Sequence, residues 1–456
     1  MEQNKIDVTI IGAGLTGLTA AYYLRKSGKK VLLLEKSHRT GGVINTIKDD
    51  GFVYETGPNT GIVGTPEIVE LFDDLKDDIN PEIANAKAKY RWIWKSGKWN
   101  ALPSGPISAT TTPLFSLKDK FRILAEPFRK PGNNPEESVA DLVLRRMGRS
   151  YLDYAVDPFI SGVYAGDPYK LITKYALPKL YNLEQNYGSF IKGAAKKKKE
   201  PKTDIEKRVS REVFSVYGGL KNLTDVLTSK IGHDHIILNV SETKVNPHEY
   251  AYRVKFVAGD KTQEIITRKV ITTIEADHLP SLLPFLPDNE IKQITNLNYA
   301  KVVQLIAAYK NWKGKELKAF GGLIPSKEKR DVLGILFTSS LFENRAPNGG
   351  TILSVFMGGI NKPEIIEMTD DEIKKIALKE IKETLKTDQQ ADLIKIFRYQ
   401  KAIPQYELSS GKRFASIEKI EKQYPGLILA GNIRDGIGMA DRIKQAKQIA
   451  EKIIKK

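Results

Sequence analysis

Three glycines near the N-terminus stand at the spacing of a phosphate-binding turn. Gly12, Gly14 and Gly17 form the pattern G-x-G-x-x-G directly after the apolar run 6–11. Glycines at these positions allow a tight turn, let the backbone approach a pyrophosphate and leave the positive end of the next helix facing it. Glu35 follows 23 residues after Gly12, where a carboxylate can accept a hydrogen bond from a ribose 2′-hydroxyl and disfavours a 2′-phosphate. The spacing therefore predicts a dinucleotide site.

Secondary-structure elements of the right type surround this turn. Residues 6–11 and 31–34 are apolar and largely β-branched or leucine, which is typical of buried parallel strands. Residues 18–27 between them are predicted to form a helix, and Gly28 stands where that helix should end. A strand, a helix, a second strand and an acid in this order predict a Rossmann-like unit. NAD and FAD both bind to such units, so this pattern alone does not choose between them.

A second glycine element follows the acid. Arg39, Gly41 and Gly42 complete the pattern E-x3-R-x-G-G that begins at Glu35. This pattern resembles the second glycine element of the FAD-dependent superfamily of amine oxidases, phytoene desaturases and protoporphyrinogen oxidases. That superfamily often has another Arg after the glycine pair, where this chain has Val43. The resemblance implies FAD as the cofactor.

Two further segments resemble parts of that superfamily that contact the flavin. The turn at Gly57, Pro58 and Asn59 is similar to the turn beside the flavin ring. After the apolar run 427–430, backbone N–H groups near the start of the last helix can face the pyrimidine edge, where negative charge develops on reduction. The residues implied are Gly431, Asn432, Gly438 and Met439. Val240 is expected to place its backbone against the adenine.

Longer blocks narrow the resemblance to the oxygen-dependent protoporphyrinogen and coproporphyrinogen oxidases. The match extends from Ile6 to the last helix. The blocks are residues 157–171, 177–191, 334–359, 402–406 and 429–441. One departure is that Ser409 and Ser410 stand where the family usually has Gly-His. No histidine role is therefore carried over, which favours chemistry driven by the flavin.

The resemblance implies a six-electron oxidation of a porphyrinogen to a porphyrin. In the family's usual scheme, hydride moves from a ring carbon to flavin N5 in three rounds, and O2 reoxidises the flavin to give H2O2. Protoporphyrinogen IX, with two propionates, and coproporphyrinogen III, with four, both stay open as the substrate. No catalytic side chain is assigned, because the cofactor carries the chemistry while the protein orients the reactants.

The resemblance also implies a set of substrate-binding residues. Arg91 matches the family position whose guanidinium pairs with a substrate propionate, a role that suits its bidentate geometry. Gly162 matches the glycine whose carbonyl holds a pyrrole N–H. Leu323, Leu336 and Phe356 are the candidates for an apolar clamp around the macrocycle.

The order of these segments predicts an α/β fold with a discontinuous, Rossmann-like FAD-binding domain. Residues 1–75, 210–280 and 411–456 are assigned to this domain. Residues 76–104 and 281–410 contain strand-like runs and are assigned to a β-rich substrate-binding domain. Within it, the apolar spacing of residues 370–385 predicts a helix with one apolar face. Residues 105–209 have helical spacing, with one of the predicted helices at 179–191, and are assigned to a helical insertion, a candidate for membrane association.

The net charge of the chain indicates which classes of binding partner it favours. Lys+Arg 72 against Asp+Glu 55 give the 456-residue chain a net charge of +17, and residues 105–209 alone hold 19 Lys/Arg and 12 Asp/Glu. An anionic membrane face and a carboxylate-bearing porphyrinogen therefore rank above nucleic acid, and enzymes of haem biosynthesis are further candidates. The lysine run 196–199 is expected to be a solvated loop. The sequence contains no cysteine, which excludes disulfides, and its five scattered histidines argue against a metal site.

The sequence predicts a cytoplasmic protein, either free or peripheral on the cytoplasmic face of the membrane. The longest uncharged apolar stretches, such as 302–309, are shorter than the roughly 18–20 residues of a membrane span. The N-terminus has no signal-peptide pattern, because its apolar run leads straight into the glycine turn.

Two other function classes stay open at this level. One is a flavin oxidase of the same superfamily that acts on an amine or a carotenoid, although no lysine of the kind that amine oxidases place beside the flavin can be located. The other is a basic protein that binds nucleic acid, although the sequence contains no recognisable nucleic-acid-binding module. The sequence makes no prediction of the oligomeric state.

Overall fold

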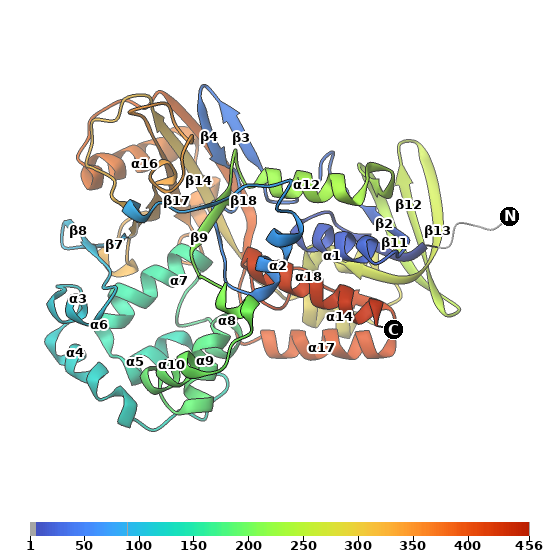
Figure 1. Ribbon diagram of the computed structural model, residues 1–456, viewed down its shortest axis with the longest axis horizontal. Helices are drawn as coiled ribbons and strands as arrows, with labels where there is room; N and C mark the ends of the chain where they lie inside the picture. Colours follow the sequence, from blue (N-terminus) through green and yellow to red (C-terminus); the bar gives the residue numbers. More distant parts are fainter. Residues whose placement is uncertain (1–5, 89, 456) are drawn as a thin grey trace.

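A computed structural model describes residues 6–88 and 90–455, and two large sheets organise this part of the chain (Figure 1). The first sheet has the strand order β10-β2-β1-β13-β12-β11, and β19 also pairs with β13. Its strands are β1 (Ile6–Ile11), β2 (Val31–Leu34), β10 (Ile236–Ile237), β11 (Val240–His248), β12 (Ala251–Ala258), β13 (Lys261–Thr272) and β19 (Leu427–Leu429). β10, β2, β1, β13 and β19 are parallel. The sheet is extended by β12, which pairs antiparallel with β13, and by β11, which pairs antiparallel with β12.

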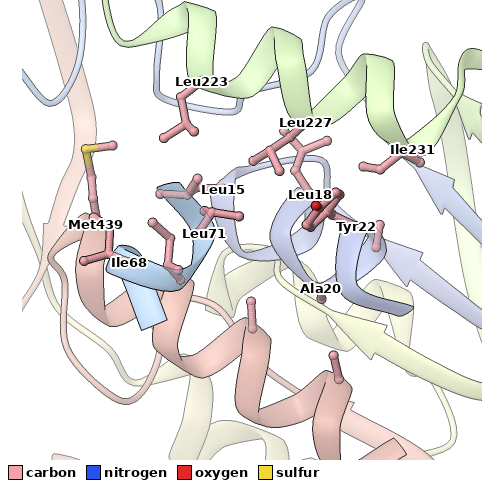
Figure 2. Close-up of a cluster of buried hydrophobic side chains, with 14 of the residues drawn as sticks. Leu15, Leu18, Ala20, Tyr22, Ile68, Leu71, Leu223, Leu227, Ile231 and Met439 are labelled. Carbon is pink, nitrogen blue, oxygen red and sulfur yellow. The ribbon is translucent and has the colours of Figure 1, made fainter. Parts of the chain in front are cut away.

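Helices cover the parallel part of this sheet, and their apolar side chains form one core (Figure 2). Leu18, Leu71 and Leu227 are fully buried in it and come from three different helices. The helices are α1 (Leu15–Lys26), α2 (Pro66–Asp74), α12 (Lys221–Ile231) and α18 (Met439–Ile454). α1 begins three residues before the predicted position 18, because Gly17 lies inside its first turn and does not delay it.

The second sheet is mostly antiparallel and has the order β18-β14-β17-β16-β15-β7-β8. Its strands are β7 (Tyr90–Lys95), β8 (Lys98–Ala101), β14 (Tyr299–Tyr309), β15 (Ala319–Leu323), β16 (Val332–Leu336), β17 (Thr351–Gly358) and β18 (Leu393–Pro404). One face is covered by α16 (Asp370–Leu385), where Ile373, Ala377 and Leu385 are fully buried among strand side chains. The predicted helix 370–385 and its apolar face are thus present as expected.

Residues 106–199 form a group of mostly short helices, drawn in teal and green in Figure 1. They are α3 (Pro106–Thr111), α4 (Leu117–Leu124), α5 (Val139–Arg146), α6 (Arg149–Tyr151), a π-helical turn at Leu152–Val156, α7 (Asp157–Tyr164), α8 (Thr173–Ala176), α9 (Pro178–Tyr187) and α10 (Phe190–Lys199). The predicted helix 179–191 is divided at Gly188, whose φ of +74° ends α9.

The prediction that residues 196–199 form a loop is wrong. Ser189 caps the start of α10 by accepting from Lys192 N, and the helix continues to Lys199. It stops just before Pro201, in agreement with the restriction that proline places on the residue before it. The four lysines are exposed on the last turn of this helix, where positive charge is favourable.

Smaller elements complete the chain. β3 (Thr46–Asp49) and β4 (Phe52–Glu55) form a hairpin, and β5 (Gly61–Ile62), β9 (Val213–Val216) and β6 (Pro81–Ile83) form a three-stranded sheet in that order. The remaining helices are α11 (Asp204–Lys207), α13 (Leu279–Leu282), α14 (Asp288–Thr295), α15 (Thr338–Leu341) and α17 (Ser410–Gln423). None of the helices in the described ranges has the length and hydropathy that a membrane crossing requires.

Candidate cofactor and substrate site

The first glycine turn lies at the carboxyl end of β1. Gly12 adopts a φ of +103°, its N–H donates to Leu34 O at 2.8 Å, and Thr273 Oγ1 donates to its carbonyl at 3.0 Å. A Cβ on Gly17 would lie 2.0 Å from the Gly12 carbonyl oxygen. These two glycines therefore allow the close approach of turn and helix that a tight strand-to-helix connection needs.

Gly14 differs from its two neighbours because a Cβ there would meet no atom within 4 Å. It is the N-cap of α1, and no side chain caps the helix. The space beside the Gly14 Cα is therefore open at the N-terminus of α1, where the positive end of the helix lies. This cradle fits the pyrophosphate of a dinucleotide.

Glu35 lies next to the same turn. Its side chain is 7% exposed, Oε2 accepts from Ala13 N at 2.6 Å and Oε1 accepts from Ser37 N at 2.9 Å. A carboxylate has about four lone-pair positions, so it can still accept a ribose hydroxyl. Val240 N donates to the Glu35 backbone carbonyl at 3.1 Å. The structure thus brings Val240 beside Glu35, whereas the predicted contact of Val240 with an adenine stays a prediction.

Arg39 holds the second glycine element in place. Its guanidinium donates to the carbonyls of Gly42 at 2.8 Å and Ile44 at 3.0 Å, and Gly41 N donates to Ala13 O at 2.8 Å. A Cβ on Gly42 would lie 3.0 Å from Gly14 Cα. The two glycine elements therefore pack directly against each other, with Arg39 as a brace of the turn.

The turn 57–59 connects the glycine elements to the second sheet. A Cβ on Gly57 would lie 1.9 Å from Val43 O, so only glycine fits there. Pro58 follows, and Asn59 Nδ2 donates back to Gly57 O at 2.9 Å. Ser354 Oγ on β17 donates to Asn59 Oδ1 at 3.1 Å. This turn therefore packs against the second glycine element on one side and contacts the second sheet on the other.

Glu55 precedes that turn and is a buried carboxyl. It accepts from Leu220 N at 2.9 Å and from Thr46 Oγ1 at 2.7 Å. Burial raises the pKa of Glu55 from 4.5 to about 7, against the opposing effects of these two hydrogen bonds and the charge of Arg345. The folded state therefore favours the protonated carboxyl.

This pKa predicts a pH-dependent effect of Glu55→Gln on stability. The pKa of Glu55 is higher in the folded state than in the unfolded state. The contribution of Glu55 to the free energy of unfolding is therefore fully present below about pH 4.5 and is lost as the pH rises to about 7. A glutamine does not titrate, so the stability of the variant does not follow this change with pH. We expect the variant to gain about 3 kcal/mol relative to wild type between pH 4.5 and 8, measured by urea unfolding across that range. A difference between the two proteins that does not change with pH would contradict the prediction.

The loop before α18 contains the last group of predicted flavin contacts. Gly431 N donates to Gln445 Oε1 at 2.8 Å, and the Asn432 carbonyl accepts from Tyr406 OH at 3.0 Å. Gly438 N donates to Asp441 Oδ2 at 3.1 Å, so that N–H already has a partner. Met439 is the first residue of α18, is 8% exposed and lies in the core of Figure 2. The cap that Asp441 provides was not identified from the sequence.

Four of the five predicted substrate residues occupy one face of the second sheet. In one row across the strands, Gly321 pairs with Arg91 on one side and with Leu336 on the other. In the row two residues further along, Gly334 pairs with Leu323 on one side and with Phe356 on the other. Positions two apart on a strand share a face, and α16 covers the opposite face. Leu336 also pairs with Ser354, which contacts the turn 57–59. The candidate clamp therefore faces the candidate flavin turn.

The fifth predicted residue, Gly162, lies on α7 and packs against the same face. A Cβ at Gly162 would lie 2.4 Å from Leu323 Cδ2. Gly162 is in the last turn of α7, where helical carbonyls lack an intrahelical partner. Gly166 N, which would continue the helix ladder to Gly162, donates instead to Ile160 O. The Gly162 carbonyl can therefore accept a hydrogen bond from a ligand.

Two polar residues of this face were not identified from the sequence. Gln304 is fully buried on β14 and donates from Nε2 to the Glu55 carbonyl at 3.0 Å. Ser354 is also fully buried. The sequence does contain a signal for both residues, because each is a polar residue inside an otherwise apolar strand. A buried polar side chain requires a hydrogen-bond partner.

The chain is similar to known proteins over nearly its whole length. The family model described as "Flavin containing amine oxidoreductase" matches residues 15–454. The chain is 30% identical to protoporphyrinogen oxidase 2 of Arabidopsis thaliana, over 98% of this chain and 93% of the relative. It is 25% identical to coproporphyrinogen III oxidase of Bacillus subtilis, over 98% and 97%. A crystal structure from Exiguobacterium sp. 255-15, provisionally named a protoporphyrinogen oxidase, covers 99% of both chains with a TM-score of 0.80 and 20% identity, and shows the same fold.

Proposed function

Because the chain belongs to the family of flavin-containing amine oxidoreductases, we propose that it oxidises a porphyrinogen to the porphyrin in haem biosynthesis. FAD is the cofactor, and the protein is a flavin oxidoreductase of the porphyrinogen oxidase group. The proposed reaction removes six electrons, uses O2 as acceptor and releases H2O2. Relatives named for protoporphyrinogen and for coproporphyrinogen III both match over nearly the whole chain, so either substrate fits the proposal.

One observation supports the proposal most strongly. The apolar residues Leu323, Leu336 and Phe356 share a sheet face with Arg91, and this face is linked through Ser354 to the turn 57–59. A flat macrocycle with carboxylate side chains requires apolar walls and a cation at the edge. As part of the proposal, residues 1–75, 210–280 and 411–456 hold FAD, and 76–104 with 281–410 hold the substrate.

The chain's own residues orient the reactants in this proposal. The cradle at Gly14 holds the pyrophosphate, Glu35 accepts from the ribose, and Val240 lies along the adenine. Bound FAD supplies a hydride acceptor. The Arg91 guanidinium binds a propionate, and the Gly162 carbonyl accepts a pyrrole N–H so that the ring is fixed between Leu323 and the cofactor.

The role of Arg91 can be tested by Arg91→Ala. Its side chain is exposed, its guanidinium lies 5.7 Å from the Phe320 ring, and no ion-pair partner is present in the described residues. Loss of a charge-assisted hydrogen bond of about 1.5–3 kcal/mol should raise KM for the porphyrinogen about tenfold or more with little change in kcat. Arg91→Lys should recover part of this loss, and Lys98→Ala on the neighbouring strand is the control. An unchanged KM would remove Arg91 from the substrate site.

The substrate itself is tested with purified holoenzyme. Protoporphyrinogen IX and coproporphyrinogen III are each added anaerobically, flavin bleaching is followed, and O2 is then admitted while porphyrin fluorescence and H2O2 are measured. Porphyrin formation with one substrate at higher kcat/KM supports the proposal and identifies that substrate. The alternative is oxidation of an amine or a carotenoid. H2O2 production from a small amine without any porphyrin would favour it.

We further propose that residues 105–209 contact an anionic membrane surface. Five large apolar side chains of this segment are each at least 69% exposed: Ile107, Leu117, Phe121, Leu124 and Phe128. Three of them recur at helical spacing on α4, and Lys120 Nζ donates to Thr110 O and Thr112 O, which places α3 against α4. Soluble monomers rarely expose such a cluster. The positive charge of the same segment suits anionic lipid.

Replacement of this apolar cluster should abolish vesicle binding. Leu117→Ser with Phe121→Ser removes two side chains that no core contact needs, so the fold and porphyrinogen activity in detergent-free buffer should be unchanged. We expect co-flotation with phosphatidylglycerol vesicles to fall at least tenfold. Tyr250→Ser, at a fully exposed tyrosine of the β11–β12 hairpin, is the control. Equal flotation of all three proteins would contradict the proposal, as would no flotation of wild type at low salt.

A further inference from the structure

Two arginines that donate hydrogen bonds to the loop 431–436, which precedes α18, are buried without a carboxylate partner among the described residues. Arg413 is 0% exposed and Arg442 is 8% exposed. Neither guanidinium lies within ion-pair distance of an Asp or Glu in the described residues, whereas Arg146, which is equally buried, contacts two glutamates. A buried charge that is not paired costs several kcal/mol. A negatively charged group bound close to these two cations would therefore be stabilised.

The hydrogen bonds of both guanidiniums go to backbone carbonyls of this loop and to neutral side chains. Arg413 Nε donates to Ile433 O at 3.0 Å and Nη2 donates to Ser410 Oγ at 3.0 Å. Arg442 Nη1 donates to Gly431 O, and Nη2 donates to Arg434 O at 2.8 Å. These bonds orient the loop, and among the described residues no carboxylate lies within ion-pair distance of either guanidinium.

Each arginine also keeps a buried N–H without a hydrogen-bond partner. These are Nη1 of Arg413 and Nε of Arg442, among the described residues. Burial lowers the pKa of both guanidiniums, opposed by Tyr406 in both cases. Arginine stays protonated in proteins even so. Both therefore carry a full charge at neutral pH.

The loop leads from the pyrophosphate turn towards the start of α18. A Cβ on Gly431 would lie 3.0 Å from Thr273 O, and Thr273 Oγ1 donates to Gly12 O. At the other end, Gly436 N donates to Tyr406 OH, and the chain enters α18 at Met439. In the proposed FAD site, this is where the pyrimidine edge of the flavin lies.

We propose that Arg413 and Arg442 provide the buried positive charge that balances the negative charge of the reduced flavin, and so raise the flavin's reduction potential. This inference rests on the proposed FAD site. Charge near the pyrimidine edge is one of the protein's means of tuning a flavin. Asp435, Asp441 and Glu407 act on the guanidiniums only at longer range. Both arginines are positioning residues, because they act through the loop and through the electrostatic field.

The test compares holoenzymes that keep or remove each charge. Arg413→Met, Arg413→Lys and Arg442→Met are purified with FAD, and the two-electron midpoint potential and the Kd for sulfite are measured. Sulfite forms a bond to flavin N5 and leaves negative charge on the pyrimidine ring, so its affinity reports the local positive charge. We expect each Met variant to bind sulfite about tenfold more weakly, with a potential about 30 mV lower for the same tenfold change.

The lysine variant separates charge from structure. Arg413→Lys keeps the charge but not the hydrogen-bond geometry, so its sulfite Kd should stay within threefold of wild type. A potential that falls as far in Arg413→Lys as in Arg413→Met would overturn the inference, and so would Met variants that retain FAD with an unchanged potential. Arg442→Met is an independent measurement if Arg413→Met does not fold. Wild-type holoenzyme that oxidises no porphyrinogen would remove the proposed function and leave this test intact.

Discussion

Gly14→Val should remove FAD binding while leaving the apoprotein folded. Gly14 has a φ of −72°, which any residue adopts, and a Cβ there would meet no protein atom within 4 Å. The valine side chain would therefore occupy only the space in front of the helix N-terminus, where the pyrophosphate is expected to lie. We expect the Kd for FAD to rise at least 100-fold, which is about 2.7 kcal/mol.

The measurement is flavin absorbance of the purified protein together with FAD titration of the apoprotein. The far-UV circular dichroism and the Tm of the apoprotein should match wild type. Gly17→Ala gives the contrast, because its Cβ would lie 2.0 Å from the Gly12 carbonyl oxygen and must disturb the turn itself. Gly105→Ala, on an open surface position with an extended φ of −162°, is the matched control. Wild-type FAD affinity in Gly14→Val would mean that the pyrophosphate does not lie there.

The parts of the fold that depend on local patterns could be predicted from the sequence. The strands around 6–11 and 31–34 follow from apolar runs next to a glycine turn, and the helix 370–385 follows from its apolar spacing. The family and the flavin cofactor were also correct, because both rest on spaced motifs. Motif spacing and hydrophobic periodicity are local properties, so they can be recognised without knowledge of tertiary contacts.

The features that were missed depend on contacts between distant segments. Arg413 and Arg442 occur in helical patterns with many charges, and such arginines are mostly exposed, so their burial could not be inferred. Gln304 and Ser354 become site residues only when β14 and β17 face the turn 57–59. The Asp441 cap on Gly438 is different, because its spacing of three residues was available in the sequence. The FAD contacts and substrate contacts assigned by residue stay predictions.

Residues of the candidate substrate site lie on one sheet face although they are far apart in the sequence, so their separation along the chain does not indicate which of them are neighbours. Arg91 is more than 200 residues from Leu323 in the chain, yet β7 and β15 are adjacent and parallel. The register brings Arg91 and Leu323 to the same face. A prediction from motifs can name these residues individually, but only the pairing of strands shows that one ligand could contact them all.

Arg146→Met should strongly destabilise the helical segment at residues 106–199. Arg146 is fully buried on α5, Nε donates to Glu184 at 2.6 Å, and Nη1 lies 3.1 Å from Glu126. Nη2 also donates to Gly188 O at 2.6 Å, at the end of α9. Methionine is apolar and carries no charge, so it would leave two buried glutamates that only partly retain partners: Ser189 and Phe190 N for Glu126, and Arg145 for Glu184.

Breaking a buried ion pair in this way typically costs about 3–5 kcal/mol. We expect that loss in the free energy of unfolding by urea, with faster hydrogen exchange confined to residues 106–199, because these contacts join α5, α9 and α10. Arg149→Met is the control, since its side chain is 65% exposed and its pair with Asp153 should contribute less than about 1 kcal/mol. Equal losses in the two variants would mean that Arg146 is stabilised by packing alone. Faster exchange spread evenly over both large sheets would show instead that the helical segment unfolds together with the rest of the chain.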